Sequence, residues 1–314
     1  MNKLILILTL LVLIPAMGWA QDISNKGSKG NLNGHYFIPL SVNRTPFTNT
    51  RIMMPLGFGQ TSSFEFPIPI IGGDSLFGAS GEILLATLGI QYRQQVRDWI
   101  SFNMKVEVAA RVGTDVKSLL IEGLDNVISF ELGTMIKLHE TKKTLLSTSL
   151  KLQNLEGNFV DINGFVQDLL DSTVNDPSIS RTVPALVAGV GLHFAWGISP
   201  TFGFSSVLAA SYGETFTRGN SDTRITFGGF IEADLNPKFK IPIGLSIGAF
   251  STTEPEYVYV DDKSAQIMIS KLSYTGRADF DLGIEIAKAT IPFENTETRP
   301  SVDMVQLVMT YFFN

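Results

Sequence analysis

Hydrophobic and polar residues alternate along residues 99–112. Apolar side chains occupy every second position from Ile100 to Val112, and the positions between them are mostly polar or charged. A period of two predicts a β-strand with one apolar and one polar face. The stretch is longer than a usual strand of roughly 5–6 residues and is sufficient for the about 9–11 residues that span a bilayer. It therefore indicates a membrane-spanning strand.

The same alternation recurs along the chain and predicts about 12 strands, with ten and fourteen as alternatives. The expected strands are residues 50–60, 84–96, 99–112, 127–138, 144–153, 183–196, 201–212, 223–235, 238–250, 266–274, 277–290 and 301–313. An even number of strands is typical of bacterial transmembrane barrels. The expected fold is therefore all-β, a transmembrane antiparallel up-and-down β-barrel.

Short and long connections alternate between these strands. The short ones lie at residues 97–98, 140–143, 199–200, 236–237 and 275–276. Tight periplasmic turns and longer external loops are typical of outer-membrane barrels. In the longest connection, residues 154–181, Phe165, Val166, Leu169 and Leu170 have helical spacing. They predict a short amphipathic helix in this external loop.

The first 20 residues have the features of an export signal. Lys3 precedes an apolar run over residues 4–14, and small residues stand before Gln21. The alternative, a membrane anchor, requires about 20 apolar residues, which this run does not reach. We expect cleavage, which makes residues 1–20 a signal peptide.

Residues 21–82 are predicted to form an N-terminal segment with the first strand and a possible plug, and residues 83–314 to form the barrel. Pro39, Pro46 and Pro55 interrupt the strand-like stretches 35–42 and 50–60. One stretch is expected to be an edge or initial strand, and the other a plug or a periplasmic segment. Residues 61–81 contain further prolines and predict a loop packed onto or into the body.

Composition narrows the functional classes. Charged residues make up 17% of the chain, below the roughly 25% of a soluble domain, and hydrophobic residues make up 44%. The net charge of −6 argues against a nucleic-acid partner. The absence of Cys excludes disulfides, thiolate metal sites and Cys nucleophiles.

The polar face of the predicted strands carries many charges of both signs. The candidate lumen-lining residues are Arg93, Lys105, Glu107, Arg111, Glu131, Lys137, Lys151, Arg224, Glu232, Arg277, Asp279, Asp281 and Glu285. One interpretation is a wet lumen wall whose charges neutralise one another. The other is a selective pore or ligand path lined by these charges. The first is favoured for any single residue.

The sequence provides little support for catalysis. Its three histidines show no ligand spacing for a metal, and it has no phosphate-binding loop, so we expect no metal site and no cofactor. His193 lies on the lumen parity, with Ser205 and Ser211 on the next strand. If one of these serines lies within hydrogen-bond reach of His193, the two could act as nucleophile and base. An outer-membrane lipid hydrolase is therefore an alternative. A structural histidine, in a protein that is not an enzyme, is the favoured reading.

The last strand alternates through Val305, Leu307, Met309, Tyr311 and Phe313. With the export signal and the strand pattern, it resembles the bacterial outer-membrane β-barrel class, although here Asn314 follows the terminal aromatic residue. The proline-bearing N-terminal segment is also similar to that of hydrophobic-compound transporters such as the long-chain fatty acid transporter family.

This resemblance implies a bacterial outer-membrane location and two partners, the lipid bilayer and the barrel-insertion machinery. It also implies a passive channel or transporter for a small or hydrophobic solute. A structural or surface-interaction barrel without transport is the alternative outside the enzyme class.

Overall fold

The computed structural model describes residues 29–42, 45–62, 64–68, 77–112, 123–160, 178, 180–214, 221–253, 264–290 and 301–313. The expected signal peptide and the helix expected around residues 165–170 lie outside these described residues. No helix in the described part of the chain is long and apolar enough to cross a membrane.

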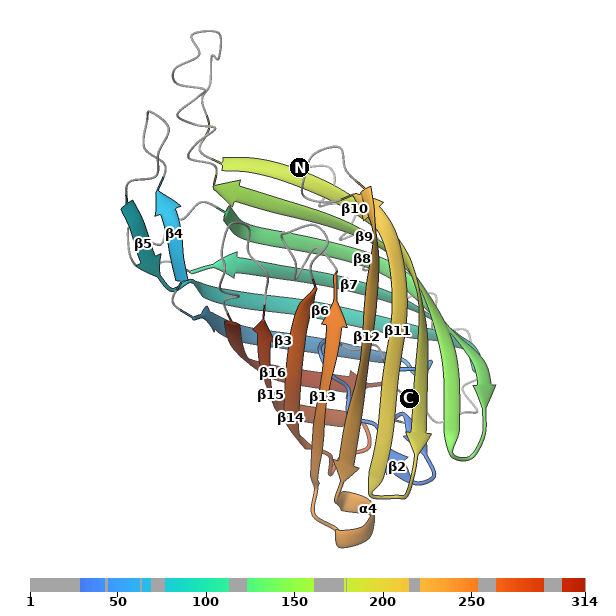
Figure 1. Cartoon of the computed structure of the whole chain (residues 1–314). Helices are drawn as coiled ribbons and strands as arrows, with labels where there is room; N and C mark the ends of the chain where they lie inside the picture. The colour runs from blue at the N-terminus through green and yellow to red at the C-terminus, as the bar shows by residue number, and fades with distance from the viewer. Residues whose placement is uncertain are drawn as a thin grey trace.

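Twelve antiparallel strands form one closed barrel (Figure 1). In barrel order they are β3 (Arg51–Thr61), β6 (Leu84–Arg97), β7 (Ile100–Arg111), β8 (Gly123–Glu140), β9 (Thr144–Val160), β10 (Ser180–Gly197), β11 (Phe202–Glu214), β12 (Ser221–Asp234), β13 (Ile243–Thr252), β14 (Ala265–Tyr274), β15 (Phe280–Thr290) and β16 (Ser301–Phe312). The barrel closes where β16 pairs with β3. The predicted all-β barrel of 12 strands is confirmed.

Two small hairpins lie outside the barrel sheet. β1 (Asn31–Leu32) pairs with β2 (His35–Tyr36), and β4 (Phe64–Ile68) pairs with β5 (Phe77–Gly81). Residues 50–60 supply barrel strand β3, whereas residues 35–42 are not part of the barrel sheet. A proline within β4 is compatible with a two-stranded hairpin, in which part of each ladder edge needs no partner.

Several strand bounds differ from the sequence prediction. β13 begins at Ile243, not at residue 238, because helix α4 (Asn236–Phe239) forms the turn before it. Pro237 suits the first turn of a helix, and Lys240 ends α4 with a φ of 58° in the left-handed region. β15 begins at Phe280, not at residue 277, and β9 runs to Val160, beyond the expected end.

The outer surface of the barrel is apolar. Large hydrophobic side chains of neighbouring strands point outward, among them Leu88, Leu208 and Ile247, which are 54%, 54% and 53% exposed. Near the short turns the exposed set also includes aromatic residues, among them Trp99, Trp196 and Phe202. A large apolar surface of this kind is unfavourable in water. Closure of the barrel also pairs the backbone groups of every strand edge, which a bilayer requires. The barrel exterior is therefore built for lipid, with an aromatic level at its turn end.

Candidate functional site

The N-terminal segment, residues 29–42 and 45–50, lies inside one end of the barrel, and nearly all its side chains are buried. Asn33 N–H donates to the Lys142 carbonyl at 2.8 Å, and Asn33 Nδ2 donates to the Gly197 carbonyl at 3.1 Å. Both acceptors lie at the short turns between strands. Figure 1 shows β2 at this end, near α4 and the C-terminus. We call it the turn end, and the opposite end the loop end.

Two carboxylates of the barrel wall accept hydrogen bonds from the main chain of this segment. The Glu232 side chain on β12 accepts from the Ile38 N–H at 2.6 Å. The Glu285 side chain on β15 accepts from the Ser41 N–H at 3.1 Å and also from the Ser41 hydroxyl. Because all four residues are buried, these bonds satisfy groups that water does not reach.

A buried ion pair holds the middle of the segment. Lys271 Nζ lies 3.0 Å from Asp281 Oδ1, and both side chains have 0% exposure. Lys271 also donates to the Pro39 carbonyl at 2.6 Å. The Tyr36 hydroxyl donates to Asp281 Oδ2 at 3.2 Å. Each charge of the pair therefore contacts both the barrel wall and the segment.

The wall on the opposite side of the lumen donates to carbonyls of the same segment. Arg93 on β6 donates to the Thr45 carbonyl at 3.1 Å and to the Phe47 carbonyl. Gln91 donates to the Ser41 carbonyl at 3.0 Å. Strands on both sides of the lumen thus bind the segment mainly through its main chain.

Inward-facing glycines create space for the segment. A Cβ atom at Gly203 on β11 would lie 2.3 Å from His35 Cδ2, and one at Gly244 on β13 would lie 2.7 Å from Ile38 Cδ1. Real Cβ atoms do not approach other heavy atoms so closely. The absence of a side chain at these two positions lets the segment pack directly against the wall.

Burial governs the ionisation of the segment. It lowers the pKa of His35 to about 4, so the ring is neutral at pH 7. Burial also lowers the pKa of Lys29, against the opposing effect of Asp281, and the Lys29 ammonium lies 4.3 Å from the Tyr36 ring centre. Burial, together with the neighbouring Asp281, raises the pKa of the Tyr36 phenol. The turn end is therefore a region that excludes water.

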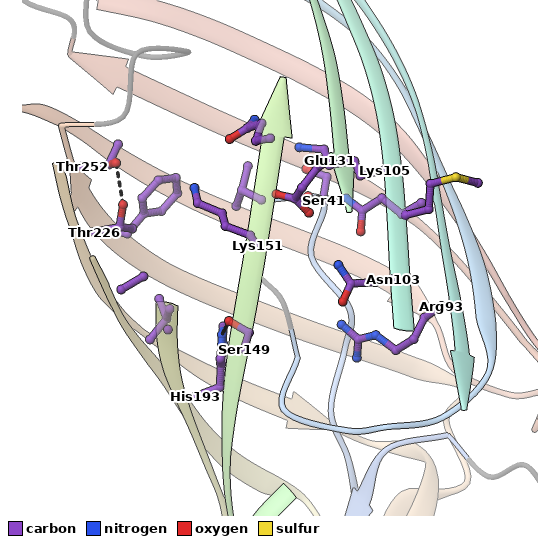
Figure 2. Close-up of a pocket in the computed structure, with 18 of the residues that line it drawn as sticks. Ser41, Arg93, Asn103, Lys105, Glu131, Ser149, Lys151, His193, Thr226 and Thr252 are labelled. Atoms are coloured by element: carbon purple, nitrogen blue, oxygen red, sulfur yellow. Dashed lines mark hydrogen bonds between the residues drawn. The ribbon is translucent and has the colours of Figure 1, made fainter. Parts of the chain in front are cut away.

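A cavity of about 140 Å³ lies in the middle of the lumen, bordering Ser41 and Val42 of the segment. One side carries charged residues of β7, β8 and β9, namely Lys105, Glu131 and Lys151. Lys151 points from β9 towards the wall that carries Thr226 and Thr252 (Figure 2). This central cavity is the candidate functional site.

The structure divides the sequence-predicted lumen residues into groups. One group forms hydrogen bonds with the N-terminal segment: Arg93, Glu232, Asp281 and Glu285. A second group lines the central cavity: Lys105, Glu131, Lys151 and again Arg93, which belongs to both groups. Glu107 joins the second group through an ion pair with Lys105.

The remaining predicted residues lie towards the two ends. Arg111 is the last residue of β7, and Arg224 donates to main-chain carbonyls at the loop end of β11. Lys137 pairs with Glu140 near a short turn at 2.6 Å.

Arg277 and Asp279 pair with each other at 2.7 Å in the turn before β15, with side chains 56% and 32% exposed. Their mutual hydrogen bonds raise the pKa of Arg277 and lower that of Asp279. This pair therefore belongs to an exposed turn and not to the lumen wall.

His193 has a serine partner that the sequence reasoning missed. Its Nε2 lies 2.9 Å from Ser149 Oγ on β9, whereas Ser205 donates to Glu232 at 2.8 Å. Only the β9–β10 register could have indicated Ser149. It places His193 opposite Ser147, and Ser149 is the next residue of β9 on the same face. Among the described residues, no group of three or more His, Asp or Glu side chains is placed to hold a metal ion.

Comparisons with known proteins identify no family for this chain. No protein-family model and no curated protein matches the chain. Among solved structures it is similar to the NanC porin, with 8% identity, a TM-score of 0.48, and coverage of 83% of this chain and 100% of that one. It is also similar to a mutant of the TodX monoaromatic hydrocarbon channel, with 11% identity, a TM-score of 0.46, and coverage of 91% and 97%.

A third neighbour is a Pseudomonas aeruginosa FadL homologue, with 8% identity, a TM-score of 0.42, and coverage of 85% and 91%. At these TM-scores the three neighbours assign no solute to this chain. Its closed barrel and lipid-facing exterior are those of the outer-membrane β-barrel class.

Proposed function

We propose that this protein is a passive outer-membrane channel for a small solute, which occupies the central cavity during passage. The observation that carries the proposal is that cavity, an internal space of about 140 Å³ at mid-lumen, surrounded by a closed barrel. Export through a cleaved signal at residues 1–20, and assembly by the barrel-insertion machinery, belong to the same proposal.

The N-terminal segment acts in this proposal as a plug. It fills the turn end of the lumen and forms one boundary of the cavity. Its contacts with the wall in the described residues are hydrogen bonds, two of them to the Lys271–Asp281 ion pair of the wall, and apolar packing, such as Phe37 and Phe47 against Leu145. Such contacts are reversible, so the segment can move aside without any covalent step.

Ion conductance in planar bilayers tests this function. We expect full-length protein to conduct weakly, and a variant that lacks residues 29–48 to show at least tenfold higher conductance, because the turn end is then open. Each variant is first checked for a boiling-dependent shift in gel mobility, which reports a closed barrel. A closed deletion variant that conducts no more than the full-length protein would contradict the plug.

Glycine substitutions test the plug without shortening the chain. Gly203→Ala places a Cβ atom against His35 and should raise the open fraction of the channel. Gly229→Ala is the matched control, because a Cβ there meets only ordinary contacts, 3.4 Å from the Phe204 ring. If no full-length or deleted form conducts any ion or solute, the surface-interaction barrel replaces the channel.

A further inference from the structure

The charged side of the central cavity carries an excess of positive charge. The lining residues include Arg51, Arg93, Lys105 and Lys151 on the cationic side and Glu131 as the one carboxylate. Adding the neighbouring Glu107, which pairs with Lys105, still leaves more cations than carboxylates. The whole chain has a net charge of −6, so this local balance is opposite to that of the protein.

Two of these cations face each other across neighbouring strands. Arg51 on β3 and Arg93 on β6 are register partners, and both are buried, each with 4% exposure. Like charges directly opposite one another destabilise a strand pair. Both also donate to the segment, Arg51 to the Thr45 hydroxyl at 2.9 Å and Arg93 to the Thr45 carbonyl at 3.1 Å, so their positive charge is fixed at the boundary between segment and cavity.

The other side of the cavity carries an apolar patch beside Thr226 and Thr252. Val207, Phe230 and Phe250 form it, on β11, β12 and β13. Phe230 and Phe250 belong to a buried apolar cluster with Leu40 of the segment, Ile267 and Ile269, and Phe250, 8% exposed, lies at its edge towards the cavity. The interior of a channel-forming barrel is ordinarily polar, so an apolar patch on the lumen wall is unusual. It offers a surface for the apolar part of a solute.

We infer that the central cavity selects small organic monoanions that carry an apolar group, with the acid group towards the cationic side and the apolar group against Val207 and Phe250. This inference rests on the proposed channel function and names its solute class. The cavity of about 140 Å³ matches the apolar part in size, because a cavity of roughly 150 Å³ holds one benzene ring. A cavity lined by positive charges attracts anions and so raises their local concentration.

Binding to the full-length protein in detergent tests this class with three fully ionised probes. Benzenesulfonate has both a ring and an acid, methanesulfonate lacks the ring, and benzyltrimethylammonium has the ring with the opposite charge. By saturation-transfer NMR titration, we expect benzenesulfonate to bind at least fivefold more tightly than either of the others. Equal binding of all three probes would overturn the inference without any variant.

Variants locate the site. Lys151→Gln and Phe250→Ala should each weaken benzenesulfonate binding at least fivefold. The matched controls lie outside the lumen: Lys288→Gln, whose side chain is 59% exposed beside Asp303, and Phe227→Ala, at a residue 57% exposed on the outer face of β12. Controls that weaken binding as much as the lumen variants would overturn the site.

Failure of this inference is distinguishable from failure of the channel function. Conductance of simple salts with no preference for benzenesulfonate refutes the solute class and leaves the channel intact. Selective benzenesulfonate binding in a barrel that conducts nothing, even without its plug, supports the site and refutes the channel.

Discussion

Two sets of charges on the same lumen wall serve different purposes. The set beneath the plug comprises Glu232, Lys271, Asp281 and Glu285, and the set at the central cavity comprises Lys105, Glu131 and Lys151. Both sets occupy inward positions of regular strands. The first set binds the segment, three members through its main chain and Asp281 through the Tyr36 hydroxyl, and is buried, whereas the second borders the cavity. The covering segment, and not the residue type, therefore determines whether a lumen charge binds the segment or borders the cavity.

The largest contrast between the two sets is expected for lysine removal. Lys271→Ala leaves Asp281 buried without its cation and should lower the free energy of unfolding by about 3–5 kcal/mol. Lys151→Ala, at a partly exposed position beside the cavity, should cost less than about 1 kcal/mol. Urea unfolding in detergent measures both. Equal losses would remove the distinction between the two sets.

A smaller effect is expected at the boundary between lumen and lipid. Val106 shares the outer face with its register partner Ile90, and Lys105 faces the cavity. Val106→Arg should cost roughly 2–4 kcal/mol if it lies at the bilayer midplane, whereas Lys105→Ala should be much milder. Folding into lipid vesicles at increasing urea concentration compares them. A larger loss for Lys105→Ala would reverse the assigned faces.

Acidification should weaken the plug selectively. The folded-state pKa of His35 is about 4 and its unfolded value is about 6.5, so only the displaced segment takes up a proton between these values. Stability of the seated segment is therefore present above pH 6.5 and falls as the pH drops towards 4, by up to about 3 kcal/mol. Protease cleavage of the segment as a function of pH measures this loss.

His139, an exposed residue near the end of β8, provides the control for this pH effect. His35→Phe should abolish the pH-dependent part of the cleavage, whereas His139→Gln should preserve it. A pH response that survives in His35→Phe would assign the effect to another group.

The smallest effect is expected at His193. Its contact with Ser149 is a buried hydrogen bond, and we expect His193→Ala to leave phospholipid turnover by the purified protein at the level of a detergent blank. Turnover by the natural protein that His193→Ala abolishes would instead support the lipid hydrolase alternative.

The regular strands were predictable because alternation depends only on which face meets lipid. Residues 301–313, for example, match β16 to within one residue. The turn before β13 was not predictable in this way, because Pro237 and Lys240, with its left-handed backbone, form a helical turn that the alternation of apolar and polar residues does not reveal. The plug contacts were not predictable either, since Ile38 and Glu232 are 194 residues apart. The apolar cavity wall escaped notice because sequence parity alone assigned the lumen to charged residues.

The long-range contacts of the segment have a consequence for assembly. Its partners on β12, β14 and β15 follow it in the chain by about 190 to 245 residues. The surface that binds residues 36–41 therefore does not exist until these strands have come together with β6. The segment precedes in the chain every strand that receives it. We expect its docking to be slow, because each of these contacts closes a long loop and carries the corresponding entropy cost.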